Sequence, residues 1–168
     1  PYTYYLTQNS FLVGAGSLNH GFRTPSSLFY LNSLFYLPVI KFYLFHIGAV
    51  SVMGFTLFIF IKKIILSMKK NKIDFLYYLS LTFIIFIIVF FYRISEHGTD
   101  RSAQILILLI IYEIFILLMK NKISKDDISI LSILFAITIS MKLFYLLYIL
   151  FLIPIIYKFI ITEGTKFF

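Results

Sequence analysis

The sequence predicts an all-α integral membrane protein: a polytopic helical bundle with four to five transmembrane helices and one interfacial helix. Hydrophobic residues make up 61% of the chain, whereas soluble domains contain about 45–50%. Several apolar runs approach the roughly 20 residues that a helix needs to span a bilayer. Lysines gather between these runs, so the net charge of +8 is mainly a signal of membrane topology. We therefore expect membrane lipid as a partner and no nucleic acid.

The N-terminal part of the chain is not expected to cross a membrane, because it is polar at first and its apolar pattern then covers too few residues. Residues 1–24 contain several glycines and are expected to form a loop on the outer face. The pattern of residues 25–38 predicts an amphipathic interfacial helix, with Thr24 as N-cap and Pro25 at the first helical position. Leucines then recur at helical spacing until Pro38 stops the pattern. A helix of about 12 residues should lie along the membrane surface, not across it.

Residues 39–161 are expected to form the transmembrane bundle, and its last apolar run is the least regular part. Lys142 and Pro154 interrupt that run, which is too long for one upright helix and short for two. Two short helices meeting near Lys142 are favoured, and one long kinked helix is the alternative. The predicted spans cover residues 42–61, 75–92, 103–119, 128–141 and 143–161.

The chain ends are expected to belong to a longer membrane protein. The sequence begins at Pro1 without an initiator methionine or a leading span, and residues 162–168 follow the last apolar run. We expect an internal fragment whose residues 162–168 form a cytoplasmic tail.

Lysine placement predicts the orientation of the bundle. The segments 62–74 and 120–127, together with the C-terminus, hold ten lysines, whereas the opposite side holds four basic residues. The positive-inside rule makes the lysine-rich side cytoplasmic. Residues 1–38 and 93–102 then share the outer face, and Lys142 is expected to approach it.

The connection between the second and third spans is dense in charge for so short a loop. Glu96 and Asp100 lie four residues apart and would share one face of a helix. Two such carboxylates could act as acid and base or bind a divalent metal. The alternative is a solvated loop whose acids pair with Arg93 and Arg101. His97, in the same loop, is a proton carrier or an interfacial residue.

Four more polar side chains stand out from the apolar background. Arg23 beside a helix start would favour a phosphate, or anchor the helix to lipid headgroups. His20 is a proton carrier or an interfacial residue. Lys142 interrupts an apolar run, which predicts a role with a lipid phosphate or with the outer acids. For Glu113, a structural hydrogen bond or a contact with Lys120 is favoured over catalysis.

Three segments in this order resemble a group of uncharacterised bacterial multi-pass proteins. The segment Gly16-Ser17-Leu18-Asn19-His20-Gly21-Phe22-Arg23-Thr24-Pro25-Ser26-Ser27 is similar to their outer-face motif. The loop from Ile94 to Asp100 is similar to their second outer loop, which has an acid at the position of Asp100. Ala136-Ile137-Thr138-Ile139-Ser140-Met141-Lys142-Leu143 resembles their break before the last span. That group looks like the GT-C superfamily of glycosyltransferases.

The resemblance implies a multi-pass protein of the bacterial inner membrane that uses a polyprenyl-phosphate sugar at the outer face. It makes Asp100 and Glu96 the candidate catalytic acids and the candidate metal ligands. Candidate contacts to the sugar or lipid phosphate are Asn19, His20, Arg23, His97, Arg101 and Lys142. GT-C enzymes also carry an acid in the first outer loop, and this chain has no Asp or Glu before Asp74. The rival functions are a transporter or flippase of lipid-linked glycans and a structural membrane subunit.

Overall fold

The computed structural model describes residues 2–9, 26–92 and 98–164, and within them the chain is helical without strands. One isolated bridge joins Leu37 and Lys41 in the connection that follows the second helix. The elements in chain order are α1 (Tyr2–Gln8), α2 (Ser27–Ser33), the short 3-10 helix η3 (Phe42–Leu44), α3 (Ile47–Lys69), α4 (Phe75–Phe90), α5 (Gly98–Met119), α6 (Lys125–Met141), the 3-10 helix η4 (Leu143–Leu152) and α7 (Ile153–Gly164).

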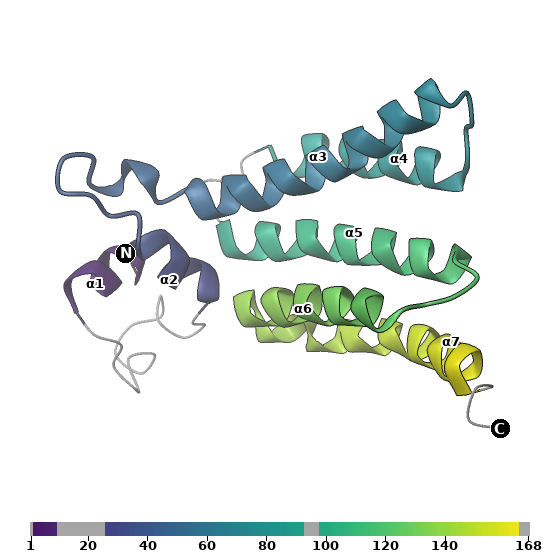
Figure 1. Cartoon of the computed structure of the whole chain (residues 1–168). Helices are drawn as coiled ribbons and strands as arrows, with labels where there is room; N and C mark the ends of the chain where they lie inside the picture. Colours follow the sequence, from purple (N-terminus) through teal and green to yellow (C-terminus); the bar gives the residue numbers. More distant parts are fainter. Residues whose placement is uncertain (1, 10–25, 93–97, 165–168) are drawn as a thin grey trace.

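The long helices run up and down a common axis, and α5 lies between the others (Figure 1). Helices α3 and α4 form one hairpin, α5 and α6 form a second, and η4 with α7 returns alongside them. More than half (56%) of the α5 span is buried, against 17% of α3 and 11% of the span from η4 into α7. We call the end that carries α2 and the start of α5 the α2 end. The opposite end, with the α3–α4 and α5–α6 turns, is the lysine end.

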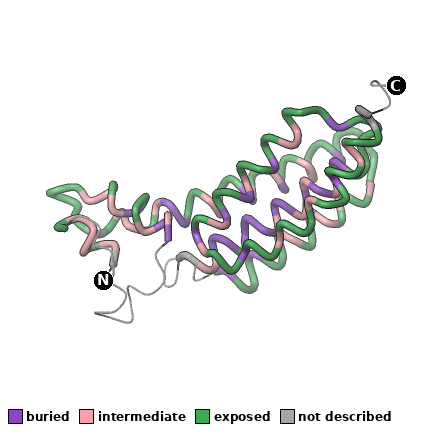
Figure 2. Tube along the Cα trace, turned by 90° about the horizontal axis from the view of Figure 1, so that it is seen from below, coloured by how far each residue is buried: buried purple, intermediate pink, exposed green. Residues whose placement is uncertain are grey.

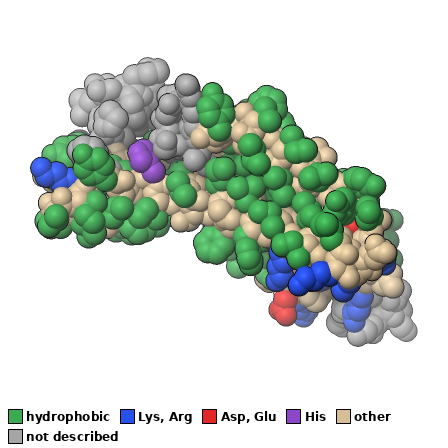
Figure 3. Space-filling model, turned by 90° about the horizontal axis from the view of Figure 1, so that it is seen from above, with side chains coloured by type: hydrophobic (Ala, Val, Ile, Leu, Met, Phe, Trp, Pro, Cys, Tyr) green, Lys and Arg blue, Asp and Glu red, His purple; other side chains and the backbone are tan. Residues whose placement is uncertain are grey.

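Large apolar side chains fill the core and also cover much of the outside, which differs from the surface of a soluble protein (Figures 2 and 3). Among the exposed side chains, Phe55 is 72% exposed and Leu143 is 74% exposed. Small residues are buried where helices meet, namely Gly48, Ala49, Thr56, Ser67, Ser80, Ser102, Ala103 and Thr138. Close contact through small residues is how helices associate in lipid, where burial of apolar surface gives no driving force. The exposed surface is therefore suited to hydrocarbon.

Three of the described helical segments are long and apolar enough to cross a membrane: Ile47–Lys69, Asp100–Met119 and Leu143–Ile161. The apolar helix α4 is shorter, at 16 residues, and α6 has 17. This result agrees with the prediction of a helical membrane protein. The predicted number of spans, four to five, is higher than the three described segments whose length and composition suit a membrane span.

The first span lies further along the chain than predicted. Residues 42–44 form only η3, and α3 continues through Lys62 to Lys69 instead of stopping at Ile61. Lysine is a good helix former, and its long stem can carry the charge away from an apolar surface, so lysine does not end a helix. Asn71, in the left-handed region at φ 50°, ends it instead. The Asn71 and Lys72 amides donate to carbonyls of the last helical turn, at 3.1 and 3.0 Å, in a Schellman motif.

The predicted interfacial helix is shorter than expected. Ser26 is the N-cap of α2, with its hydroxyl accepting from the Leu28 amide at 3.4 Å, and the helix ends at Ser33. The sequence had placed the start at Pro25, with Thr24 as the cap, and the end near Pro38; Thr24 and Pro25 lie outside the described residues. Serine and threonine are both favoured as N-cap residues, so the residue types alone do not locate the helix start.

The break at Lys142 is where the sequence placed it. Helix α6 ends at Met141, Lys142 is extended (φ −158°, ψ 120°), and η4 begins at Leu143. The second segment runs on through Pro154, near the start of α7, where a proline is tolerated because its amide needs no helical partner. The segment therefore continues to Gly164, past the predicted end at residue 161.

Candidate functional site

The most prominent polar feature of the α2 end is an ion pair between α5 and α6. Lys142 Nζ lies 2.6 Å from Asp100 Oδ2, across 42 residues of sequence. Asp100 is in the first turn of α5, and Lys142 is the C-cap residue of α6. Each charge therefore complements the dipole of its own helix. The Asp100 side chain is 51% exposed and that of Lys142 36%, so both can also reach a ligand.

A cavity of about 550 Å³ lies beside this ion pair, between α4, α5 and η4. Its wall is mostly aromatic and aliphatic, and its polar groups come from Arg101, Gln104, Tyr145 and Tyr148. The lining residues are Phe86, Phe90, Phe91, Arg101, Gln104, Ile107, Leu108, Ile111, Tyr145 and Tyr148. Tyr145 connects the two features, because its hydroxyl donates to the Asp100 carbonyl at 3.5 Å. The size and the few convergent polar groups are typical of small-ligand and lipid sites.

Helix α2 is fixed against the bundle near the same ion pair. The Ser27 and Ser140 hydroxyls are 2.8 Å apart, which joins α2 to the last turn of α6. The buried Asn32 accepts the Gly48 amide with its Oδ1 at 3.2 Å. That amide belongs to the first turn of α3 and has no partner inside its own helix. Asn32 thus caps α3 from a different element.

The structure describes three of the eight predicted site residues. It brings together Asp100 and Lys142, which agrees with the prediction that Lys142 interacts with an acid of this loop. It also places Arg101 in the wall of the neighbouring cavity. The other five lie outside the described residues, and their roles stay predictions: Asn19, His20, Arg23, Glu96 and His97.

The predicted metal site at Glu96 and Asp100 stays a prediction, because Glu96 lies outside the described residues. Among the residues that the structure describes, no group of three or more His, Asp or Glu side chains could hold a metal ion. The Lys142 ammonium pairs with the Asp100 carboxylate, and it would repel a divalent cation there.

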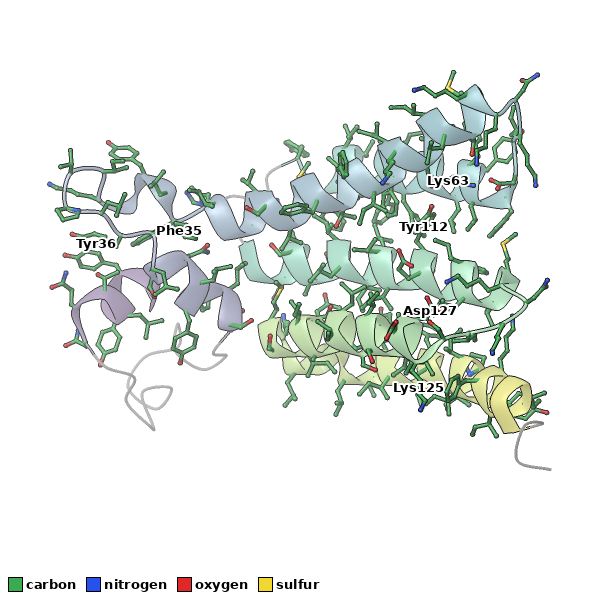
Figure 4. The ribbon with its side chains drawn as sticks, in the orientation of Figure 1. Phe35, Tyr36, Lys63, Tyr112, Lys125 and Asp127 are labelled. Carbon is green, nitrogen blue, oxygen red and sulfur yellow. The ribbon has the colours of Figure 1, made fainter. Side chains whose placement is uncertain are left out.

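At the lysine end, two ion pairs and a lysine hold the turns, and Figure 4 labels one partner of each pair, Lys63 and Asp127. Lys63 lies 2.7 Å from Asp74, the N-cap of α4, and its hydrogen bond lowers the pKa of that carboxyl. Lys120 lies 2.7 Å from Asp127 in the capping box of α6, and it lowers the pKa of Asp127 in the same way.

Lys158 of α7 completes the lysine end. Its ammonium donates to the carbonyls of Leu117 at 3.2 Å, Leu118 at 2.7 Å and Lys120, so it caps the C-terminus of α5. A cation that satisfies terminal carbonyls stabilises a helix through both hydrogen bonding and the helix dipole.

Sequence reasoning missed three polar residues of the cavity wall, namely Gln104, Tyr145 and Tyr148. Gln104 is the one amide within the otherwise apolar start of the third span, and it lies one turn after Asp100. Tyr145 follows Lys142 by three positions, and its backbone amide donates to the Lys142 carbonyl at 3.1 Å. Tyrosines are so common in this chain that Tyr145 did not stand out from the other twelve.

The fold and the ion pair beside an aromatic cavity define the class: an α-helical membrane protein with a candidate ligand site at one end of its bundle. The chain belongs to the family described as Domain of unknown function (DUF8201), whose model matches residues 4–168. Among curated proteins and among solved structures, nothing matches the chain.

Proposed function

We propose that this protein is a membrane glycosyltransferase that moves a sugar from a polyprenyl-phosphate donor to a lipid-linked or cell-surface acceptor, in the inner membrane of a bacterium. The observation that carries the proposal is the Asp100–Lys142 pair beside the aromatic cavity. A polyprenyl phosphate needs an apolar surface for its chain and a cation for its phosphate. The α2 end supplies both within a few residues, and the GT-C resemblance of the sequence implies the same donor.

In the proposed reaction, a hydroxyl of the acceptor attacks the anomeric carbon of the donor sugar. The bond from that carbon to the phosphate oxygen breaks, and the leaving phosphate keeps the electron pair. The hydroxyl proton passes to a carboxylate that acts as general base. Lys142 and Arg101 stabilise the charge that develops on the phosphate. When Lys142 turns toward the phosphate, Asp100 is released to hold the acceptor hydroxyl or to take its proton.

The rival function, a transporter or flippase, would need polar groups along a path through the bundle. Glu113 is the deep acid of α5, and it follows the cavity residue Ile111 by two positions. Two positions correspond to about 200° around a helix, so Glu113 lies on nearly the opposite side of α5 from the cavity. Lys120, which the sequence placed within reach of Glu113, pairs with Asp127. Charged groups at one end of the bundle favour the enzyme over the transporter.

The proposal is tested by sugar transfer in membrane vesicles that contain the full-length protein, with a panel of labelled polyprenyl-phosphate hexoses. Asp100→Asn should abolish most of the transfer. Lys142→Gln should slow it about 10- to 100-fold, because a charge-assisted contact is worth roughly 1.5–3 kcal/mol. Asp126→Asn is the matched control, since Asp126 is an exposed acid at the opposite end of the bundle. Unchanged transfer by both site variants at equal expression would exclude the site.

A second assay separates the enzyme from the flippase. Movement of a labelled lipid-linked glycan across the vesicle membrane, without any sugar transfer, would favour the flippase.

Arg23 lies outside the described residues, and its proposed phosphate contact has its own test. Arg23→Ala should slow transfer about 10- to 100-fold, and Arg23→Lys should recover part of the loss because only the bidentate geometry is removed.

A further inference from the structure

The lysine end carries exposed lysines that make no ion pair with a carboxylate of the described residues. Lys69, Lys70 and Lys72 surround the α3–α4 turn. All three are exposed, and none lies within ion-pair distance of a carboxylate in the described part of the chain. Lys63, Lys120 and Lys158 of the same end differ, because each of them holds a turn or a helix end.

Helix stability accounts for only part of this charge. Lys69, in the last turn of α3, and Lys70, its C-cap residue, complement the dipole of that helix, whereas Lys72 lies beyond the helix. The Schellman motif at Asn71 fixes the backbone between Lys70 and Lys72, so the lysines of this turn start from an ordered position. The backbone of the turn is therefore ordered, and its lysine side chains are exposed.

The neighbouring side chains indicate what these lysines meet. Exposed apolar residues lie among them in sequence: Met68 at 65% exposure, Ile73 at 59% and Phe75 at 51%. Apolar side chains of this kind belong in hydrocarbon, while the adjacent ammonium groups belong at its boundary with water. Basic residues at that boundary are attracted to anionic headgroups.

We propose that Lys69, Lys70 and Lys72, around the α3–α4 turn, form a binding surface for anionic phospholipid headgroups at the lysine end. This surface is independent of the proposed sugar transfer, which concerns the opposite end of the bundle. It shares no residue with the Asp100–Lys142 pair. A basic residue near an anionic surface contributes roughly a fivefold preference, and the contribution falls as salt rises.

Lipid binding to the whole purified chain by native mass spectrometry tests this surface. The probes are phosphatidylglycerol, which is anionic, and phosphatidylcholine with the same acyl chains, which is zwitterionic. The wild type should retain phosphatidylglycerol preferentially, and the preference should fall with added salt. Changing all three lysines to glutamine should lower the preference about tenfold or more. A preference that does not respond to salt in the wild type would overturn the proposal, even if the triple variant failed to fold.

A pair of single variants provides the matched control. Lys70→Gln and Lys41→Gln each remove one exposed lysine, but Lys41 lies in the connection after α2, at the other end of the bundle. Lys70→Gln should lower the phosphatidylglycerol preference about fivefold, and Lys41→Gln should leave it unchanged. Equal losses in the two variants would show that net charge alone decides retention and would overturn the localised surface.

Discussion

Replacing Gly48 by alanine tests how α2 is fixed against the bundle. A Cβ at this position would lie 2.6 Å from Asn32 Oδ1, and 3.0 and 3.1 Å from methyl groups of Leu28 and Leu31. The clash with Asn32 also breaks the hydrogen bond from the Gly48 amide. Overpacking costs about 1–3 kcal/mol and the lost hydrogen bond about 1 kcal/mol, against a helix-propensity gain of at most about 1 kcal/mol. We expect a net loss of about 1–3 kcal/mol.

Gly54 provides the matched control, because it lies in the same helix and a Cβ there would meet nothing within 4 Å. Gly54→Ala should gain about 0.5–1 kcal/mol, so the two variants should differ by about 2–4 kcal/mol. Unfolding of the purified protein in mixed micelles, followed by circular dichroism, measures both.

A double-mutant cycle then identifies the cause. Asn32→Ala removes the atom that the new methyl group meets, so in the Gly48→Ala background it should cost less than it does alone, or even restore stability. Equal stability of the two glycine variants would refute the contact between α2 and α3. Strict additivity of the Asn32 and Gly48 changes would refute the clash as its basis.

Three further predictions concern ion pairs and helix ends. Lys158→Met should lower the free energy of unfolding by about 1–2 kcal/mol, because the terminal carbonyls of α5 lose their donor. Asp74→Asn should make unfolding less sensitive to acid: the pKa of Asp74 is lowered from 3.8, so its stabilisation is present above pH 3.8 and is lost as pH falls through the lowered pKa. Asp100→Asn and Lys142→Gln should each change stability by less than about 1 kcal/mol, because both side chains are partly exposed.

The controls for these predictions come from the lysine end. Lys125→Met changes an exposed lysine that caps no carbonyl of a neighbouring helix, and it should leave stability within about 0.5 kcal/mol of the wild type. Asp126→Asn should leave the acid transition unchanged, because Asp126 is exposed and outside the two ion pairs. A Lys158 variant as stable as the Lys125 variant, or a wild-type acid response in Asp74→Asn, would contradict the assigned interactions.

Composition and periodicity were enough to predict the helical membrane class and the break at Lys142, because both depend on local properties of the chain. An ionisable residue in a long apolar run is costly unless it meets a partner, and Lys142 meets Asp100. Helix ends were less predictable. Lys62 is compatible with the inside of a helix, and the true end of α3 depends on the left-handed conformation of Asn71.

The cavity could not be predicted from sequence, because it is formed by helices that are distant along the chain. Phe86, Leu108 and Tyr148 look like ordinary span residues until α4, α5 and η4 are placed together. The cap that Asn32 gives to α3 depends likewise on tertiary contact, since periodicity indicated only that Asn32 lay on the polar side of α2. In each case the missing information was which helix faces meet.

Binding of a polyprenyl phosphate to the purified chain tests the central claim most directly. Native mass spectrometry would compare a polyprenyl phosphate with the uncharged polyprenol of the same length, for the wild type and two tryptophan variants. Leu108→Trp fills the cavity, whereas Leu147→Trp changes a residue of η4 that is 63% exposed and lies outside the cavity wall. We expect the phosphate to bind about tenfold or more tightly than the alcohol, since a charge-assisted contact is worth roughly 1.5–3 kcal/mol, with binding lost in Leu108→Trp and kept in Leu147→Trp. Equal binding of phosphate and alcohol, or full binding by Leu108→Trp, would contradict a lipid-phosphate site at the α2 end.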